Sequence, residues 1–295
     1  MLLREYKTYF TIQLQPLFDD TEIESFFFIV LEYLHQLKRV DLALQPNFSI
    51  NKTQLEKWNV ILQDLKKEKP IQYIIGETEF YGLRFFVDEN TLIPRPETEE
   101  LVDWIIKSQE KVRNEKVELS ILDIGTGTGC IPISLKKNIS HATVFAIDVS
   151  EGALAIAKKN AIENKVEVNF IKTDILKISD LQNFPTSNFQ FPTQFDIIVS
   201  NPPYVRNLEK QEIKKNVLEY EPHLALFVED DDALLFYRKI AELAQKSLSI
   251  NGKLFFEINQ YLGNETVRLL KDLGFQNIQL KKDFYGNDRM ICCNL

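Results

Sequence analysis

Apolar residues recur at helical spacing through the first part of the chain. In residues 22–37 and again in residues 52–65 they fall three and four positions apart, as Leu55 and Trp58 do in the second stretch. This spacing collects the apolar side chains on one face of an amphipathic helix. We therefore predict a small helical domain over residues 1–75.

The hydrophobic pattern then shortens. Aromatic and β-branched residues surround Gly82, which is typical of two short strands joined by a tight turn. Pro94 and Pro96 prevent a continuous helix before Glu97. We predict a β-hairpin linker over residues 76–93, with the domain junction directly after it.

Residues 94–295 alternate short apolar runs with amphipathic helical patterns. Such alternation predicts an α/β fold, with a mainly parallel sheet that is covered by helices on both faces. Ser150 is a good N-cap for a helix over residues 151–164, and the polar residues 173–194 predict a connecting loop with one helical turn. The expected strands are residues 120–124, 143–147, 166–171, 195–200, 253–258, 275–280 and 289–293.

Composition limits the classes of protein to consider. A chain of 295 residues with 44% hydrophobic residues can bury a sizeable core. Its formal net charge of −8 argues against broad affinity for nucleic acid or anionic membranes. It has no run of 18 apolar residues and no signal-peptide pattern. We expect a cytoplasmic monomer.

The histidines and cysteines do not form a recognisable metal motif. Their spacing matches neither CxxC nor the Cys/His patterns that bind zinc. We expect reduced thiols without a catalytic role, ordinary histidines and no metal site. The residues concerned are Cys130, Cys292, Cys293, His35, His141 and His223.

A glycine-rich segment lies between the first strand of the sheet and the helix after it. In a doubly wound sheet this turn faces the ligand crevice, and glycine lets a ligand lie against bare backbone. The GxGxG spacing differs from the GxGxxG of dinucleotide sites, and no Lys-Ser/Thr pair follows for phosphate. We predict a nucleoside-binding turn formed by Gly125, Thr126, Gly127, Thr128 and Gly129.

Three aspartates support this prediction. Asp148 ends the second strand 23 residues after Gly125, where a carboxylate can accept hydrogen bonds from ribose hydroxyls. Asp174 follows the third strand and is placed to accept from an adenine amino group. Asp123 has two possible roles: it ties down the glycine loop through backbone N–H groups, or it contacts an amino group of the ligand. Taken singly, such features also occur as turns or helix caps.

The fourth strand is followed at once by Asn201, Pro202, Pro203 and Tyr204. The carboxyl ends of neighbouring strands face one crevice, so this loop should lie beside the glycine turn. The Asn201 side-chain oxygen and the Pro202 carbonyl can accept from both hydrogens of one planar NH2 group, on which Tyr204 can stack. We predict that Asn201, Pro202 and Tyr204 are catalytic; the alternative is a merely rigid turn.

These acceptors suit methylation of a carboxamide nitrogen. An amide nitrogen is barely nucleophilic, so the methyl donor must be strongly activated, as a sulfonium is. In-line positioning then becomes the main catalytic device. We assign no strong general base, because the nitrogen can lose its proton after transfer and the sequence identifies no acid with a perturbed pKa.

The glycine-rich and Asn-Pro-Pro-Tyr motifs resemble those of amino-methyltransferases. Four further segments resemble the HemK/PrmC family of protein-(glutamine-N5) methyltransferases, and the likeness extends from about residue 22 to the end. These segments are Pro-Ile-Gln-Tyr-Ile-Ile-Gly (70–76), Phe-Tyr-Gly-Leu (80–83), Ile-Pro-Arg-Pro-Glu-Thr-Glu-Glu-Leu (93–101) and Gly-Asn-Asp-Arg (286–289).

The resemblance implies a Rossmann-like class I methyltransferase that uses S-adenosylmethionine. It implies methylation of the glutamine in the Gly-Gly-Gln motif of peptide chain release factors, which the helical domain would help to grip. The glycine loop, Asp148 and Asn201 would hold the cofactor, and residues 201–204 would hold the glutamine amide. The methionine end of the cofactor would be covered by Arg95, Glu97 and Thr98.

The chain departs from the family pattern at two places. Acidic residues 229–232 replace a Gly-x-Asp-Gly stretch, and we interpret them as a solvated turn and helix start. Ile175 replaces the usual aromatic residue after Asp174, which leaves apolar packing on adenine but not stacking.

Two other functions fit the same motifs. One is methylation of an exocyclic base amine of the adenine N6 type, which would require base flipping and neutralisation of phosphates. The net negative charge counts against that substrate, and we expect no direct nucleic-acid target. The other is a noncatalytic nucleoside-binding adaptor, since fold does not establish activity.

Overall fold

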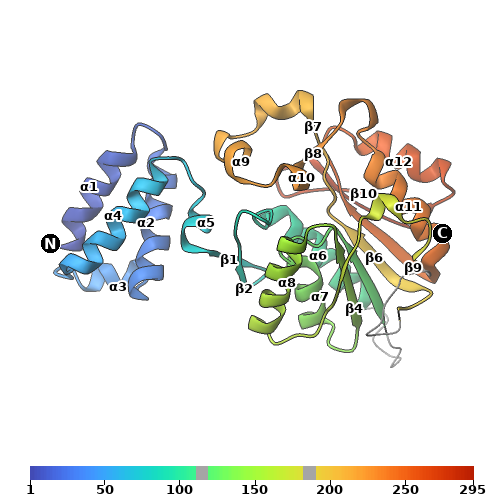
Figure 1. The fold of residues 1–295 in the computed structure, drawn as a ribbon, viewed down its shortest axis with the longest axis horizontal. Coiled ribbons are helices and arrows are strands. Elements are labelled where there is room, and N and C mark those ends of the chain that lie inside the picture. The colour runs from blue at the N-terminus through green and yellow to red at the C-terminus, as the bar shows by residue number, and fades with distance from the viewer. Residues whose placement is uncertain (111–118, 182–190) are drawn as a thin grey trace. The chain divides into compact units, whose positions relative to one another are not determined.

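The computed structural model describes residues 1–110, 119–181 and 191–295 (Figure 1). The chain divides into two compact units. The first contains Met1–Gly76 and Lys214–Tyr220, and the second contains Glu77–Ile213 and Glu221–Leu295. A short segment from the second half of the chain thus packs with the N-terminal helices.

The first unit is helical. Its α4 coincides with predicted residues 52–65. Its α2 begins two residues before the expected range because Asp19 caps it, accepting from Glu22 N at 2.9 Å, and it ends early because Gln36 takes a left-handed conformation. The helices are α1 (Leu3–Leu14), α2 (Asp20–His35), α3 (Arg39–Leu44), α4 (Lys52–Leu65), α5 (Ile71–Ile75) and α9 (Lys215–Tyr220).

An aromatic cluster forms the core of this unit. Trp58 stacks on Phe27 with ring centroids 4.9 Å apart, and Tyr6 and Phe10 meet Trp58 edge to face. All four side chains are buried. Aromatic pairs of this kind contribute beyond the area they bury.

The second unit begins with a hairpin of β1 (Glu77–Phe80) and β2 (Leu83–Phe86). Tyr81 and Gly82 between the strands both have positive φ, as a two-residue hairpin turn requires. Phe80 and Phe85 are buried in the core of the second unit. The hairpin that we predicted as a linker therefore packs as part of this unit.

Seven strands form the main sheet of the second unit, in the order β10-β11-β9-β6-β3-β4-β5 (Figure 1). Strands β5, β4, β3, β6 and β9 are parallel, and β11 runs antiparallel to both β9 and β10. This confirms the mainly parallel seven-stranded sheet. The strands are β3 (Ser120–Ile124), β4 (Thr143–Asp148), β5 (Asn169–Lys172), β6 (Phe195–Ser200), β9 (Leu248–Glu257), β10 (Gln276–Lys282) and β11 (Asp288–Asn294).

Two predicted strands begin three or more residues away from their expected starts. Residues 166–168 are not part of β5, and Val166 N donates to Ala161 O, closing the end of the preceding helix. Strand β9 begins five residues before the expected range. The pairing of β6 with β9 shifts register between Phe195 and Ile197, which accommodates the polar segment around Gly252. A Cβ on Gly252 would lie 2.9 Å from Phe195 O, so the close approach of the two backbones requires glycine.

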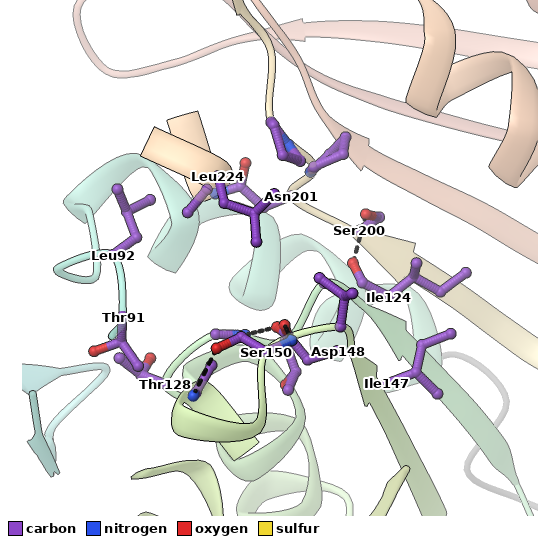
Figure 2. A pocket seen from close by; sticks show the side chains of 18 of the residues that line it. Thr91, Leu92, Ile124, Thr128, Ile147, Asp148, Ser150, Ser200, Asn201 and Leu224 are labelled. Carbon is purple, nitrogen blue, oxygen red and sulfur yellow. Dashed lines mark hydrogen bonds between the residues drawn. The ribbon is translucent and has the colours of Figure 1, made fainter. Parts of the chain in front are cut away.

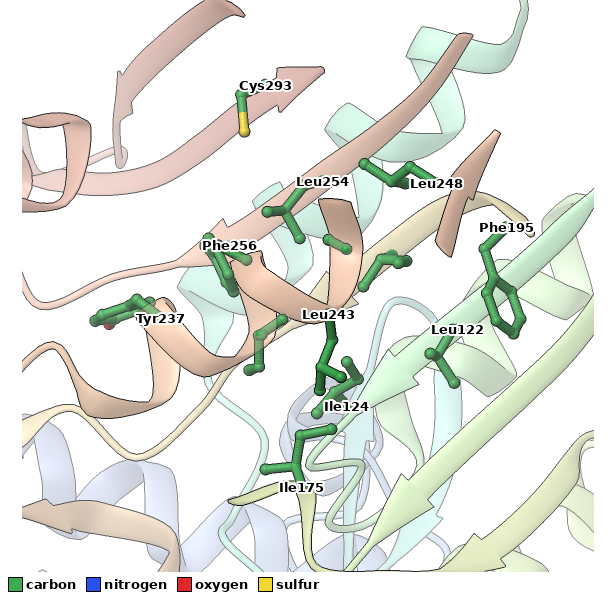
Figure 3. Packing of buried hydrophobic residues seen from close by; sticks show 14 of the residues in the cluster. Leu122, Ile124, Ile175, Phe195, Tyr237, Leu243, Leu248, Leu254, Phe256 and Cys293 are labelled. Atoms are coloured by element: carbon green, nitrogen blue, oxygen red, sulfur yellow. The ribbon is translucent and has the colours of Figure 1, made fainter. Parts of the chain in front are cut away.

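Alternate strand residues supply two hydrophobic clusters. Leu122 and Ile198 belong to one cluster with Leu243 of the helix Leu235–Ser247 (Figure 3), whereas Ile121 and Ile197 belong to the other. Successive strand side chains point to opposite faces, so the sheet has a core on each side. The helices are α6 (Pro96–Glu110), α7 (Cys130–Asn138), α8 (Glu151–Glu163), α11 (Leu235–Ser247) and α12 (Gly263–Asp272).

Short elements occur in the connecting segments. The 3-10 turn Ile175–Lys177 is the single helical turn expected after β5, while residues 182–190 of that predicted loop lie outside the described part of the chain. Acidic residues 229–232 include the 3-10 turn Asp230–Asp232. The sequence did not indicate β7 (Val205–Arg206), β8 (Phe227–Val228) or α10 (His223–Leu226).

Within the described ranges, no helix is long and apolar enough to span a bilayer. The same residues contain no group of three or more His, Cys, Asp or Glu side chains placed to hold a metal ion.

Candidate active site

A cavity of about 270 Å³ lies in the second unit, where β3, β4 and β6 end (Figure 2). The glycine loop and residues 201–203 both line it. Ser200 Oγ donates to Ile124 O at 2.6 Å, which ties the ends of β6 and β3 together. The two loops that the sequence analysis placed in one crevice therefore meet in one cavity.

The glycine loop is shaped by its backbone. Gly125, Gly127 and Gly129 have φ values of 78°, 53° and 79°, which side chains with a Cβ rarely adopt. A Cβ on either of the first two would meet nothing within 4 Å, so each leaves bare backbone beside open space. A Cβ on Gly129 would lie 2.9 Å from Ile133 Cδ1, so this glycine is also required for packing.

Asp148 holds the glycine loop as well as lining the cavity. Its Oδ2 accepts from Gly127 N and its Oδ1 from Ser150 N, both at 2.8 Å. Burial raises the pKa of Asp148, and the two backbone N–H groups oppose that rise. Each carboxylate oxygen keeps a further acceptor site, which suits a ribose diol.

Asp174 lines the same cavity and caps the 3-10 turn, accepting from Leu176 N at 3.0 Å. The hydrogen bond from Lys177 lowers the pKa of this carboxyl, so it is an anionic acceptor. Ile175 beside it is buried and lines the cavity. These positions agree with apolar packing near a base rather than aromatic stacking.

Asp123 does not tie down the glycine loop through backbone N–H groups, so that interpretation was wrong. Neither carboxylate oxygen has a hydrogen-bond partner among the described residues. The loop is held instead by Asp148 and by Ile147 O, which accepts from Gly125 N and Thr126 N at 2.9 and 3.1 Å. Burial raises the pKa of Asp123 to about 7, and a cationic ligand group would satisfy it.

Asn201, Pro202 and Pro203 line the cavity, whereas Tyr204 is not among its lining residues. The Tyr204 hydroxyl donates to Glu257 Oε1 at 3.1 Å, and its ring packs against a hydrophobic core cluster. Burial raises its pKa beyond the usual range, so it remains protonated. Stacking of Tyr204 on a substrate amide therefore stays a prediction.

The three residues expected near the methionine end of the cofactor differ in position. Arg95 lines the cavity and pairs at 2.6 Å with Glu221, whose side chain is 1% exposed. Thr98 also lines the cavity, but its hydroxyl donates to Glu257. Glu97 is not among the lining residues.

Several residues that shape this site were not predicted from the sequence. Glu221 and Glu257 are buried acids, and Asn160 joins α8 to both the hairpin and the glycine loop. The only signal for Glu257 is an acidic residue that ends an apolar strand. Other lining residues without a sequence signal are Asn90, Thr91, Leu92, Ser200, Leu224, Phe236 and Ile240.

The site fits S-adenosylmethionine. Bare glycine backbone, a carboxylate at the end of β4 and the buried Asp123, which has no hydrogen-bond partner in the described ranges, match a nucleoside that carries a cationic amino acid. The apolar walls near Ile175 suit an adenine ring.

Solved structures with a similar fold are methyltransferases. One is the hMettl16 catalytic domain in complex with a 3′UTR hairpin, with a TM-score of 0.55, 14% identity and coverage of 83% of this chain and 82% of that chain. Another is the human methyltransferase 10 domain containing protein, with a TM-score of 0.50, 15% identity and coverage of 81% and 97%. At these identities the likeness establishes the fold.

Sequence comparison identifies the family. A model described as PrmC N-terminal domain matches residues 17–76, and one described as Methyltransferase small domain matches residues 109–224. The release factor glutamine methyltransferase of Flavobacterium psychrophilum is 62% identical, with coverage of 100% of this chain and 99% of the relative. That of Bacteroides thetaiotaomicron is 41% identical, with coverage of 97% and 98%. The chain belongs to the HemK/PrmC family of S-adenosylmethionine-dependent release factor glutamine methyltransferases.

Proposed function

We propose that this enzyme transfers a methyl group from S-adenosylmethionine to the N5 nitrogen of the glutamine in the Gly-Gly-Gln motif of peptide chain release factors. The relatives that carry this activity in their names match the whole chain. The observation that carries the proposal is that Asn201 and Pro202 line the same cavity as the glycine loop and Asp148.

Each part of the cavity has a proposed role. Bound S-adenosylmethionine supplies an electrophilic methyl group on a sulfonium. Residues 125–129 and Asp148 hold its nucleoside, and Asp174 accepts from the adenine amino group. Asp123 and Arg95 serve the methionine end. Glu97 lies outside the lining residues, so we give it no direct contact with the cofactor.

The substrate amide is held by the loop after β6. Asn201 Oδ1 and the Pro202 carbonyl accept from the two amide hydrogens, while Pro203 and Tyr204 keep the loop rigid. The nitrogen–carbon bond forms as the carbon–sulfur bond breaks, and S-adenosylhomocysteine leaves. The methylated nitrogen then loses one proton to water, so the site needs alignment more than a strong base.

We further propose that the helical unit is the substrate-recognition domain and that the enzyme acts as a cytoplasmic monomer on a protein substrate. The net charge of −8 of the whole chain disfavours a nucleic-acid target, whose phosphates would have to be neutralised.

A competition assay tests the substrate. The protein is incubated with labelled S-adenosylmethionine, a release factor and duplex DNA in one reaction. We expect label in the release factor alone. Label only in the DNA would favour the base-amine alternative, and cofactor binding without transfer to either would favour the adaptor.

A further inference from the structure

Five side chains form a hydrogen-bonded group beside the cavity, which we call the Glu257 cluster: Thr98, Asn201, Tyr204, Glu257 and Arg289. They come from α6, from the loop after β6, and from β9 and β11. Glu257 is 1% exposed and receives a hydrogen bond on each carboxylate oxygen. The transfer described above gives this buried acid no role.

The direction of each hydrogen bond in the Glu257 cluster follows when Glu257 is ionised. Burial raises the pKa of Glu257, and the Thr98 hydroxyl, the Arg289 cation and the Tyr204 hydroxyl oppose that rise. Thr98 Oγ1 donates to Glu257 Oε2 at 2.6 Å, the length typical of a hydroxyl that donates to an ionised carboxylate. Tyr204 donates its single proton to Glu257 Oε1 at 3.1 Å and accepts from Arg289 Nη1 at 3.4 Å. Glu257 therefore acts only as an acceptor.

These hydrogen-bond directions determine the orientation of the Asn201 side-chain amide. Thr98 has one proton and gives it to Glu257, so toward Asn201 it can only accept. Asn201 Nδ2 donates to Thr98 Oγ1 at 3.4 Å. The reversed amide would set its oxygen against the Thr98 lone pairs. A contact of this length adds little stability, but it distinguishes the two orientations of the amide.

We propose that Glu257 and Thr98 are positioning residues that hold the Asn201 amide with its oxygen available to the substrate, and that they thereby make the site select a carboxamide over a carboxylate. This inference rests on the proposed function. It assigns Thr98 to substrate selection instead of cofactor binding.

The selectivity follows from hydrogen-bond complementarity. A glutamine NH2 brings two donors to the acceptors Asn201 Oδ1 and Pro202 O, whereas a glutamate carboxylate brings only acceptors. A site that is built to hydrogen-bond one polar group rejects an analogue that leaves the polar groups of the site unpaired. If the Asn201 amide reversed, its NH2 would instead favour the carboxylate.

Thr98→Val tests the hydrogen bonds that link Asn201 through Thr98 to Glu257, because valine keeps the shape of threonine and removes the hydroxyl. The Asn201 NH2 then loses its acceptor and gains by turning to water in the cavity, since an unpaired buried donor is costly. Two dissociation constants are measured on enzyme saturated with S-adenosylhomocysteine. One is for the release factor, and the other is for the same factor with glutamate in place of the Gly-Gly-Gln glutamine.

We expect the wild type to prefer glutamine and Thr98→Val to lower that preference by about 10- to 100-fold. Thr98→Ser, which restores the hydroxyl, should recover it. Thr266→Val is a matched control, because it removes another buried hydroxyl that bonds within the protein, on α12 outside the lining residues. It should leave the preference unchanged.

Glu257→Leu provides a second route if Thr98→Val does not fold. It removes both acceptor oxygens, so the Thr98 hydroxyl can donate to the Asn201 amide oxygen instead, and the preference should fall again. A folded Thr98→Val or Glu257→Leu enzyme with the wild-type preference would overturn the inference. So would weaker S-adenosylhomocysteine binding with the preference intact. A wild type that does not methylate the release factor would instead refute the proposed function.

Discussion

Asn201 offers a hydrogen-bond acceptor and a donor in one short planar group, and the structure provides a separate use for each. The donor meets Thr98, and the residue itself lines the cavity. An aspartate at this position would keep the acceptor but would place a second carboxylate close to Glu257. An asparagine therefore suits this position both because its NH2 group faces the Thr98 hydroxyl and because its oxygen can accept from the proposed substrate.

Asn201→Ala should reduce kcat by on the order of 10²–10³, because it removes one preorganised partner of the reacting amide. Folding should be unchanged, since the side chain is only half-buried. Steady-state methylation of a release factor measures the effect. Asn264→Ala, an exposed site on α12, is the control. Equal losses in both variants would refute the role of Asn201.

Asp123 predicts a pH dependence of stability in the cofactor-free protein. Burial raises its pKa to about 7, so between the unfolded and folded pKa values the folded state binds the extra proton. Its stability therefore falls as pH rises from about 4 to 7. Asp123→Asn should remove this loss and be more stable than wild type at pH 8, by roughly 2–4 kcal/mol.

Urea unfolding at pH 5 and pH 8 checks this prediction when both proteins also carry Trp58→Phe, so that fluorescence reports Trp104 in the same unit as Asp123. The advantage of Asp123→Asn should be small at the lower pH and large at the higher. The same advantage at both values would show that Asp123 does not titrate in this range.

At the scale of elements, local patterns in the sequence were sufficient for much of the fold. Helix α4 and strands β3 and β6 have the predicted bounds, because an apolar period or run and its caps are encoded locally. The start of β9 was missed because Asn251 and Gly252 are residues typical of a turn, whereas the structure keeps them in the strand through a register shift.

The candidate site was predictable only where consecutive residues carry the chemistry. The glycine loop and residues 201–203 were found in this way. Glu221 and Glu257 act through partners more than 100 residues away in sequence, Ile93 and Thr98 respectively, which no local pattern shows. Asp123 was ambiguous because its buried state depends on packing around the strand.

Asn160 should be the most sensitive link between the hairpin and the sheet. Its Nδ2 donates to Phe86 O at 3.0 Å and Thr128 O at 2.9 Å, and its Oδ1 accepts from Phe86 N at 2.6 Å. Asn160→Ala leaves these backbone groups unpaired, so we expect a loss of about 2–4 kcal/mol in the free energy of unfolding.

Chemical denaturation measures that loss, and Asn138→Ala is its control because the Asn138 side chain bonds within its own helix, to Ser134 O, among the residues that the structure describes. The control should lose less than about 1 kcal/mol. S-adenosylhomocysteine should also bind the Asn160→Ala protein more weakly, because Thr128 belongs to the glycine loop. A loss no larger than that of the control would contradict the proposed link.

At the scale of the whole molecule, each compact unit contains one of the two tryptophans, Trp58 in the helical unit and Trp104 in the methyltransferase unit. A ligand that binds one folded unit stabilises that unit by about 2.7 kcal/mol at 100 times its Kd. S-adenosylhomocysteine should therefore raise the Tm reported by Trp104 more than that reported by Trp58.

Single-tryptophan proteins, Trp58→Phe and Trp104→Phe, allow the two transitions to be followed separately by thermal denaturation. Equal shifts in both would show that the units unfold as one cooperative body. The segment Lys214–Tyr220 is the described part of the second half that packs with the helical unit, through Lys215 to Glu68 at 2.7 Å and Tyr220 Oη to Lys67 O at 2.9 Å.

If one cavity brings an activated methyl group to a carboxamide nitrogen, the methyl group must appear on that nitrogen. Tandem mass spectrometry of a release factor, after incubation with the enzyme and S-adenosylmethionine, locates it. We expect a single added methyl on the side-chain nitrogen of the Gly-Gly-Gln glutamine, strongly reduced with Asn201→Ala. An unmodified glutamine, or a methyl group on any other residue alone, would contradict it.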